Sequence, residues 1–166
     1  ADIGVDPARL AVAGSSAGAA LAAGLAQRCA EGELPPIVGV LLHQPVLDDR
    51  PTASKAEFAT TPGFDGAAAK LMWRHYLGDT APDAASVPAR NHRLIDTPTT
   101  FITCSELDPL RDEAVDYARR LMRCGVRTDL HVFGGTCHGF DSLRPEWAVS
   151  RALFTMQCAA LGRFFA

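Results

Sequence analysis

Ser16, Asp108 and His138 are three residues of the types that together perform nucleophilic catalysis. A serine hydroxyl is a weak nucleophile at neutral pH. It needs a histidine that accepts its proton, and a carboxylate that holds this histidine in the correct tautomer. The order Ser, Asp, His along the chain differs from the order in the chymotrypsin and subtilisin types. We therefore treat these three residues as a candidate triad.

Ser16 stands at the centre of the sequence Gly14-Ser15-Ser16-Ala17-Gly18, which matches Gly-x-Ser-x-Gly in one frame only. Apolar residues 10–13 precede it and a run of small residues, 17–30, follows it. This context favours a nucleophile elbow, a sharp turn between a strand and a helix, over an ordinary tight turn. The flanking glycines are expected because the serine backbone is strained and its neighbours must approach without Cβ atoms.

His138 is the favoured histidine because small residues flank it in a loop that follows a predicted strand. Its rival is His43, which comes directly after another predicted strand. The remaining histidines are expected to be surface or satisfied core residues: His75, His92 and His131.

Asp108 is the favoured carboxylate because it precedes Pro109 in a loop, where it can face a histidine. Its rival Asp112 lies where the N-cap of a helix is expected, which is a structural role. A thiol nucleophile at Cys137 is disfavoured because adjacent side chains diverge and no charged neighbour is evident from the sequence.

The apolar patterns predict alternating strands and helices and hence a parallel sheet with right-handed crossovers. Strands are expected at 10–13, 37–42, 99–104 and around 130–132; helices are expected at 17–30, 66–77, 112–124 and 146–163. Ligands bind beyond the carboxyl ends of such strands. Each residue of the candidate triad lies just beyond one of these strand ends.

Two helices carry apolar faces whose roles can be predicted. In helix 66–77, a core stripe is favoured over the wall of an acyl-chain pocket; its residues are Ala68, Leu71, Met72 and Tyr76. In helix 112–124, the residues expected to point inward are Val115, Ala118, Leu121 and Met122.

Composition narrows the class of partner. The chain has 166 residues, 48% hydrophobic content and a net charge of −3, which fit one globular domain spanning residues 1–166 and disfavour nucleic-acid binding.

No apolar run approaches the ~20 residues of a membrane span, and no signal-peptide pattern is present, so a cytoplasmic protein is predicted. The five cysteines lack metal-site or disulfide spacing and are expected to be mostly buried; no metal or cofactor is predicted.

Several motifs together resemble the hormone-sensitive-lipase-like α/β hydrolases, the fold-3 esterases. They are the sequence around Ser16, Glu106-Leu107-Asp108-Pro109-Leu110-Arg111-Asp112-Glu113, His138-Gly139-Phe140, Pro45-Val46-Leu47-Asp48 and Trp73-Arg74-His75-Tyr76-Leu77-Gly78. The resemblance implies the carboxyl-terminal half of an α/β-hydrolase fold, with about four parallel strands flanked by helices in three layers. It also implies a carboxylic ester hydrolase acting on a small-molecule acyl ester, with Ser16 as nucleophile, His138 as general base and Asp108 as the orienting carboxylate.

The sequence departs from the family pattern at three points. Ser15 replaces an aspartate and Ala19 replaces a glycine, and both changes keep the elbow viable. The upstream His-Gly-Gly-Gly loop, which supplies oxyanion-hole amides, does not occur, nor do the first strands or the cap helices. Of the hydrogen-bond donors expected in the oxyanion hole, only the backbone N–H of Ala17 is present, so low activity of the isolated chain is predicted.

The family sheet order implies that strand 10–14 exposes an unpaired edge. We expect that edge to pair with a missing N-terminal segment or with a second copy of the chain. Two other functions remain open: a serine peptidase of the prolyl-oligopeptidase kind, and a non-catalytic ligand receptor like the gibberellin receptors. The receptors lose the catalytic histidine, whereas His138 is present here.

Overall fold

The computed structural model describes residues 4–166 and contains a four-stranded parallel sheet. The strands lie in the order of the sequence, β1 (Ala11–Ser15), β2 (Gly39–His43), β3 (Thr100–Leu107) and β4 (Thr128–Cys137). Each pairs in parallel with the next. The predicted parallel sheet is therefore confirmed, and all four carboxyl ends lie along one edge.

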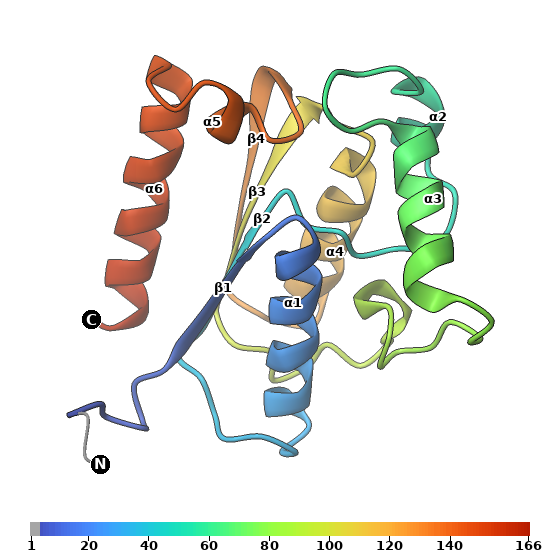
Figure 1. Cartoon of the computed structure of the whole chain (residues 1–166). Coiled ribbons are helices and arrows are strands. Elements are labelled where there is room, and N and C mark those ends of the chain that lie inside the picture. The colour runs from blue at the N-terminus through green and yellow to red at the C-terminus, as the bar shows by residue number, and fades with distance from the viewer. Residues whose placement is uncertain (1–3) are drawn as a thin grey trace.

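Helices cover both faces of this sheet (Figure 1). α1 (Ala17–Ala30) and α4 (Arg111–Arg123) lie on one face, and α6 (Ala148–Phe164) lies on the other. The shorter or more peripheral elements are α2 (Ala53–Glu57), α3 (Gly66–Leu77), η1 (Pro88–Arg90) and α5 (Phe140–Leu143). This arrangement confirms the predicted three-layer α/β/α architecture.

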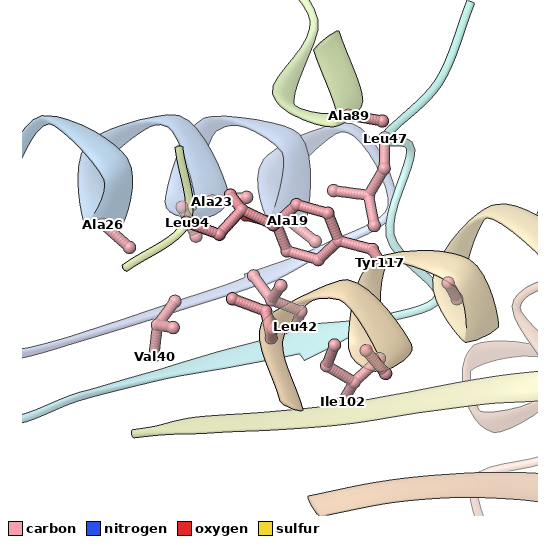
Figure 2. Close-up of a cluster of buried hydrophobic side chains, with 14 of the residues drawn as sticks. Ala19, Ala23, Ala26, Val40, Leu42, Leu47, Ala89, Leu94, Ile102 and Tyr117 are labelled. Carbon is pink, nitrogen blue, oxygen red and sulfur yellow. The ribbon is translucent and has the colours of Figure 1, made fainter. Parts of the chain in front are cut away.

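The small residues of α1 allow the helix to lie close to the sheet. Figure 2 shows alanines of α1 directed toward side chains of β2, β3 and α4, among them Leu42, Ile102 and Tyr117. The alanines of α1 buried in this core are Ala19, Ala22, Ala23 and Ala26. Larger side chains at these positions would hold helix and sheet apart, because protein interiors are close-packed.

Burial differs between the inner strands and the first strand. Every residue of β2 is buried, as expected for a continuous apolar run inside a parallel sheet. β1 forms one edge of the sheet, and its Ala13 is exposed although it is apolar. The predicted edge position of this strand is confirmed for the described residues.

The predicted inward faces of two helices are wrong in part. In α4, Ala118 and Leu121 are fully buried, but 38% of Val115 and 48% of Met122 is exposed. The buried face of α4 is instead completed by Glu113, Ala114 and Tyr117. A prediction based on apolar residues alone therefore did not include Glu113 in the buried face of this helix.

The predicted core stripe of α3 is also wrong in part, because Leu71 and Tyr76 are exposed. The buried residues of this helix are Ala69 and Trp73. Met72 and Tyr76 line a groove between α3 and α1, so the alternative interpretation as a pocket wall fits these two residues better.

Two boundaries and the cysteine prediction need correction. α4 begins at Arg111, so Asp112 lies within its first turn and is not the N-cap. β4 extends to Cys137, through glycines that the sequence had placed in a loop. All five cysteines are free thiols, but only Cys104 is buried and Cys158 is exposed, so they are not mostly buried.

Candidate active site

The residues of the candidate triad meet beyond the carboxyl ends of three strands. Ser16 follows β1, Asp108 follows β3 and His138 follows β4. Ser16 Oγ lies 3.0 Å from His138 Nε2, and His138 Nδ1 lies 2.8 Å from Asp108 Oδ2. A hydroxyl, an imidazole and a carboxylate are thus connected in the order that proton transfer from the serine requires.

The turn at Ser16 has the strained backbone of a nucleophile elbow. Its φ of 54° lies in the left-handed region, which a residue with a side chain seldom adopts. The Ser16 N–H donates to the His43 carbonyl at 2.8 Å, and the Ser16 carbonyl accepts from Ala19 N–H at 3.0 Å. These bonds secure the turn between the end of β2 and the first turn of α1.

The two glycines of the motif have different surroundings. A Cβ at Gly14 would lie 2.2 Å from the Gly18 carbonyl oxygen, so β1 and α1 approach too closely for any side chain there. A Cβ at Gly18 would meet no atom within 4 Å among the described residues. Steric need is therefore found for Gly14 and not for Gly18.

Asp108 is fully buried and held on both carboxylate oxygens. Oδ1 accepts from Leu110 N–H at 2.9 Å, while Oδ2 faces the His138 ring. The rival Asp112 points elsewhere, because its carboxylate accepts from Ser54 N–H and from the Arg111 guanidinium. Only Asp108 of this pair contacts the histidine.

His138 is positioned by a turn and by an aromatic neighbour. Gly139, the next residue, has φ 72°, and the Phe64 ring lies 4.9 Å from the imidazole, tilted by 37°. Phe64 comes from the irregular segment before α3 and is a contact that the sequence did not reveal. It shields one face of the ring, leaving the two nitrogens to Ser16 and Asp108.

The rival His43 belongs to a separate buried network. Its Nδ1 lies 2.7 Å from Thr103 Oγ1 and its Nε2 lies 3.1 Å from Asp141 Oδ1. The hydrogen bond from His43 lowers the pKa of Asp141 from its ordinary value. Of the remaining histidines, His75 and His92 are exposed and His131 lies against the Phe101 ring, as surface or core residues do.

Two cysteines belong to the strands that lead to the site, Cys104 in β3 and Cys137 at the end of β4. Cys137 contributes its carbonyl oxygen, which accepts from Gln44 and Ser105. Burial raises the pKa of the Cys104 thiol to about 12, so that thiol stays protonated at neutral pH and is a poor nucleophile.

Ala17 places a backbone donor beside Ser16. It is the first residue of α1, and amides of a first helical turn have no partner within their helix. Ala17 is exposed and lines one end of a groove of about 820 Å³ between α1, α3 and residues 83–91. Leu21 and Leu25 of α1 line the same groove and are exposed.

Gln44 is the most notable polar residue at the site that the sequence did not single out. It is fully buried, and its side chain bonds to groups before and after His138. No local pattern could have identified it, because its partners lie 61 to 95 residues further along the chain.

Among residues 4–166, no group of three or more His, Cys, Asp or Glu side chains is arranged to hold a metal ion. Within the same part of the chain, no helix is both long and apolar enough to cross a membrane.

A strained Gly-x-Ser-x-Gly turn and hydrogen-bonded serine, histidine and aspartate side chains at the strand ends of a parallel α/β sheet are the features of an α/β hydrolase. The family model described as alpha/beta hydrolase fold matches residues 1–142, and the chain belongs to this family. The predicted resemblance to hormone-sensitive-lipase-like α/β hydrolases is thereby confirmed.

Several relatives that the chain matches are named as esterases. The esterase LipI of Mycobacterium tuberculosis is 38% identical over 142 residues, which cover 83% of this chain and 44% of LipI. The crystal structure of esterase LipW from Mycobacterium marinum superimposes with a TM-score of 0.95 at 62% identity, covering 96% of this chain and 51% of LipW. A bacterial heroin esterase superimposes with a TM-score of 0.94 at 37% identity, covering 99% and 54% of the two chains. The chain spans about half the length of the relatives that it matches.

Proposed function

We propose that the protein is a serine carboxylic ester hydrolase that uses Ser16, His138 and Asp108 as its catalytic triad. The observation that carries this proposal is the pair of contacts from His138, 3.0 Å to Ser16 Oγ and 2.8 Å to Asp108 Oδ2. The esterase names of the relatives support an ester as the substrate.

In the first half of the reaction, Ser16 Oγ attacks the ester carbonyl carbon while His138 Nε2 takes the hydroxyl proton. Asp108 holds the Nδ1–H and stabilises the imidazolium that forms. The tetrahedral intermediate collapses as the imidazolium returns its proton to the leaving alcohol. An acyl group then remains on Ser16.

In the second half, His138 takes a proton from a water molecule, whose oxygen attacks the acyl carbon. The bond between Ser16 Oγ and the acyl carbon then breaks as the His138 imidazolium returns this proton to Oγ, which releases the carboxylic acid and restores the Ser16 hydroxyl. No metal or cofactor takes part in this scheme.

The Ala17 N–H is one donor to the negative oxygen of the tetrahedral intermediates. Losing one donor of an oxyanion hole costs ~3 kcal/mol of transition-state stabilisation. We infer that further donors come from a segment outside these 166 residues, and that this segment or a second copy of the chain pairs with the open edge of β1.

The groove along α1 is our candidate for the acyl-binding surface. Its end beside the elbow includes Ala17, Ala20 and Val46, and on the facing side Met72 and Trp73. An apolar surface next to the nucleophile suits the hydrocarbon part of an ester.

Two alternative functions would give different experimental results. A serine peptidase of the prolyl-oligopeptidase kind has the same chemistry and differs in cleaving amides. A ligand receptor on this fold lacks catalysis. The contacts of His138 disfavour the receptor, because a receptor has no use for a relay between serine and carboxylate.

The decisive experiment compares the full-length protein with its Ser16→Ala variant. We expect the wild type to hydrolyse p-nitrophenyl acetate and to bind a fluorophosphonate probe at Ser16, and the variant to do neither. A prolyl peptide amide tested in parallel separates esterase from peptidase. Undiminished ester hydrolysis by Ser16→Ala would refute the proposal.

A further inference from the structure

Gln44 adopts a backbone conformation that its own type does not favour. Its φ of 46° lies in the left-handed region, where asparagine and glycine are much commoner than glutamine. The residue is nevertheless fully buried, directly after β2. The conformation of the turn does not explain why the residue is a glutamine. We therefore look for the reason in the contacts of its side chain.

The Gln44 side chain holds the backbone on both sides of His138. Its Oε1 accepts from Gly139 N–H at 2.8 Å. Its Nε2 donates to Ser105 Oγ at 2.7 Å and to the Cys137 carbonyl at 3.3 Å. Ser105 Oγ also donates to that carbonyl, at 3.0 Å. The residues before and after His138 are thus tied to one buried amide.

Regular sheet pairing is interrupted where His138 leaves β4. Ser105 of β3 pairs with Phe133, whereas Leu107 pairs with Cys137, so the register shifts between these two pairs. Such an irregularity locally disrupts the ladder of backbone hydrogen bonds. At this point the Cys137 carbonyl accepts hydrogen bonds from the side chains of Gln44 and Ser105.

The same short segment also anchors the nucleophile. Ser16 N–H donates to the carbonyl of His43, the neighbour of Gln44, and Gln44 N–H donates to the Thr103 carbonyl at 2.7 Å. Residues 43 and 44 consequently hold Ser16 through a backbone carbonyl and the His138 loop through a side chain. The backbone of Ser16 and the loop at His138 are therefore attached to the same two-residue segment.

We propose that Gln44 is a positioning residue that holds His138 within hydrogen-bond distance of Ser16. This inference rests on the proposed function, in which His138 is the general base. Gln44 contacts neither His138 Nε2 nor Ser16 Oγ, so it acts through the backbone at 137–139. Misplacing a catalytic group by ~1 Å costs up to ~100-fold in rate.

The first test replaces Gln44 in the full-length protein by methionine, which has similar length and no hydrogen-bonding amide. The control is Thr100→Val, which also removes a buried hydrogen bond at nearly constant volume. Thr100 is buried at the amino end of β3, and its Oγ1 donates to the Pro98 carbonyl at 2.8 Å. We expect Gln44→Met to lower kcat for p-nitrophenyl acetate ~10- to 100-fold with KM within ~2-fold. Thr100→Val should lower the melting temperature and leave kcat within ~2-fold.

The second test is Gln44→Asn, which separates the turn from the side chain. Asparagine suits a positive φ better than glutamine, but its amide is one methylene too short for the three contacts. A role in the turn alone predicts unchanged or higher thermal stability and normal kcat. The positioning role predicts a kcat reduced ~10-fold or more, together with lower thermal stability, because buried hydrogen-bonding groups lose their partner.

A kcat within ~2-fold of wild type for Gln44→Asn or Gln44→Met would overturn the inference, and so would an equal loss of kcat in Thr100→Val. If both Gln44 variants fail to fold, Ser105→Ala is compared with wild type instead. We expect it to lower kcat at constant KM, and an unchanged kcat would contradict the inference. Ser16→Ala keeps the two proposals apart: if it retains activity the proposed function fails, whereas if it is inactive and the Gln44 variants are normal only the positioning role fails.

Discussion

Gly14 and Gly18, the two outer glycines of the elbow, have opposite steric surroundings. A Cβ at Gly14 would overlap the carbonyl of Gly18, whereas a Cβ at Gly18 would meet nothing within 4 Å among the described residues. Gly14 is therefore required because no Cβ fits at its position, whereas no described contact requires a glycine at position 18.

The Gly14→Ala variant should lose stability by about 3 kcal/mol, because the collision is with backbone that cannot move aside cheaply. In the 166-residue chain, Gly18→Ala should be neutral or stabilise by up to ~1 kcal/mol, since alanine is the better helix former. Thermal unfolding of both variants measures the difference. Equal losses in the two variants would contradict the open surroundings found for Gly18.

The Asp108→Asn variant of the full-length protein should lower kcat for p-nitrophenyl acetate about 10⁴-fold, because an amide no longer holds the His138 tautomer. Asp112→Asn is the matched control, since its carboxylate contacts Ser54 and Arg111 instead of the imidazole. It should keep kcat within a few-fold. A small effect of Asp108→Asn, or an equal effect of both, would contradict the assignment of Asp108.

The Asp141→Asn variant should lose about 2 kcal/mol of stability at pH 7, because the carboxylate accepts a hydrogen bond from buried His43. The folded pKa of Asp141 lies below the ordinary 3.8, so this contribution is present in full above that value and is lost as the pH falls through the folded pKa. Urea unfolding from pH 7 downward should show wild type and variant converging below pH 3.8.

Asp129→Asn is the control for this series. Asp129 pairs with Arg163 on the surface, where both side chains are more than half exposed. Such a pair contributes less than about 1 kcal/mol. A constant stability difference for Asp141→Asn at every pH would contradict the role given to its charge.

The 166-residue chain expressed alone should self-associate and hydrolyse esters weakly, because β1 offers an unpaired edge. Light scattering and a p-nitrophenyl acetate assay measure the two properties. Ala13→Lys, which adds a charge to an exposed position on this strand, should reduce association. A dispersed monomer as active as the full-length protein would contradict the proposed pairing.

Much of the fold could be predicted because its signals are local. An apolar run bounded by turn residues predicts a buried strand, and the small residues after Ser16 predict a helix that lies close to the sheet. Parallel strands bring their carboxyl ends to one edge, so Ser16, Asp108 and His138 could be placed near one another before any distance was known.

The faces of the helices were harder to predict, because the neighbours that cover a face are not encoded in its own spacing. Leu71 and Tyr76 of α3 belong to an apolar pattern and are exposed, while the charged Glu113 of α4 is buried. Glu113 is stabilised there by Lys55, whose Nζ lies 2.6 Å from Glu113 Oε2 and which comes from α2, a distant segment.

By itself, the sequence determined the alternation of strands and helices, the elbow and the residue types of the candidate triad, because these follow from local patterns. The edge position of strand 10–14 was implied only by the resemblance to the fold-3 esterases. Only the tertiary structure decided that His138 faces Ser16 while His43 bonds to Asp141, and that Gln44 holds the loop around His138. The physical reason is that hydrogen bonds have strict distance and direction requirements. Residues about 100 positions apart in the chain meet those requirements only when the whole sheet has formed.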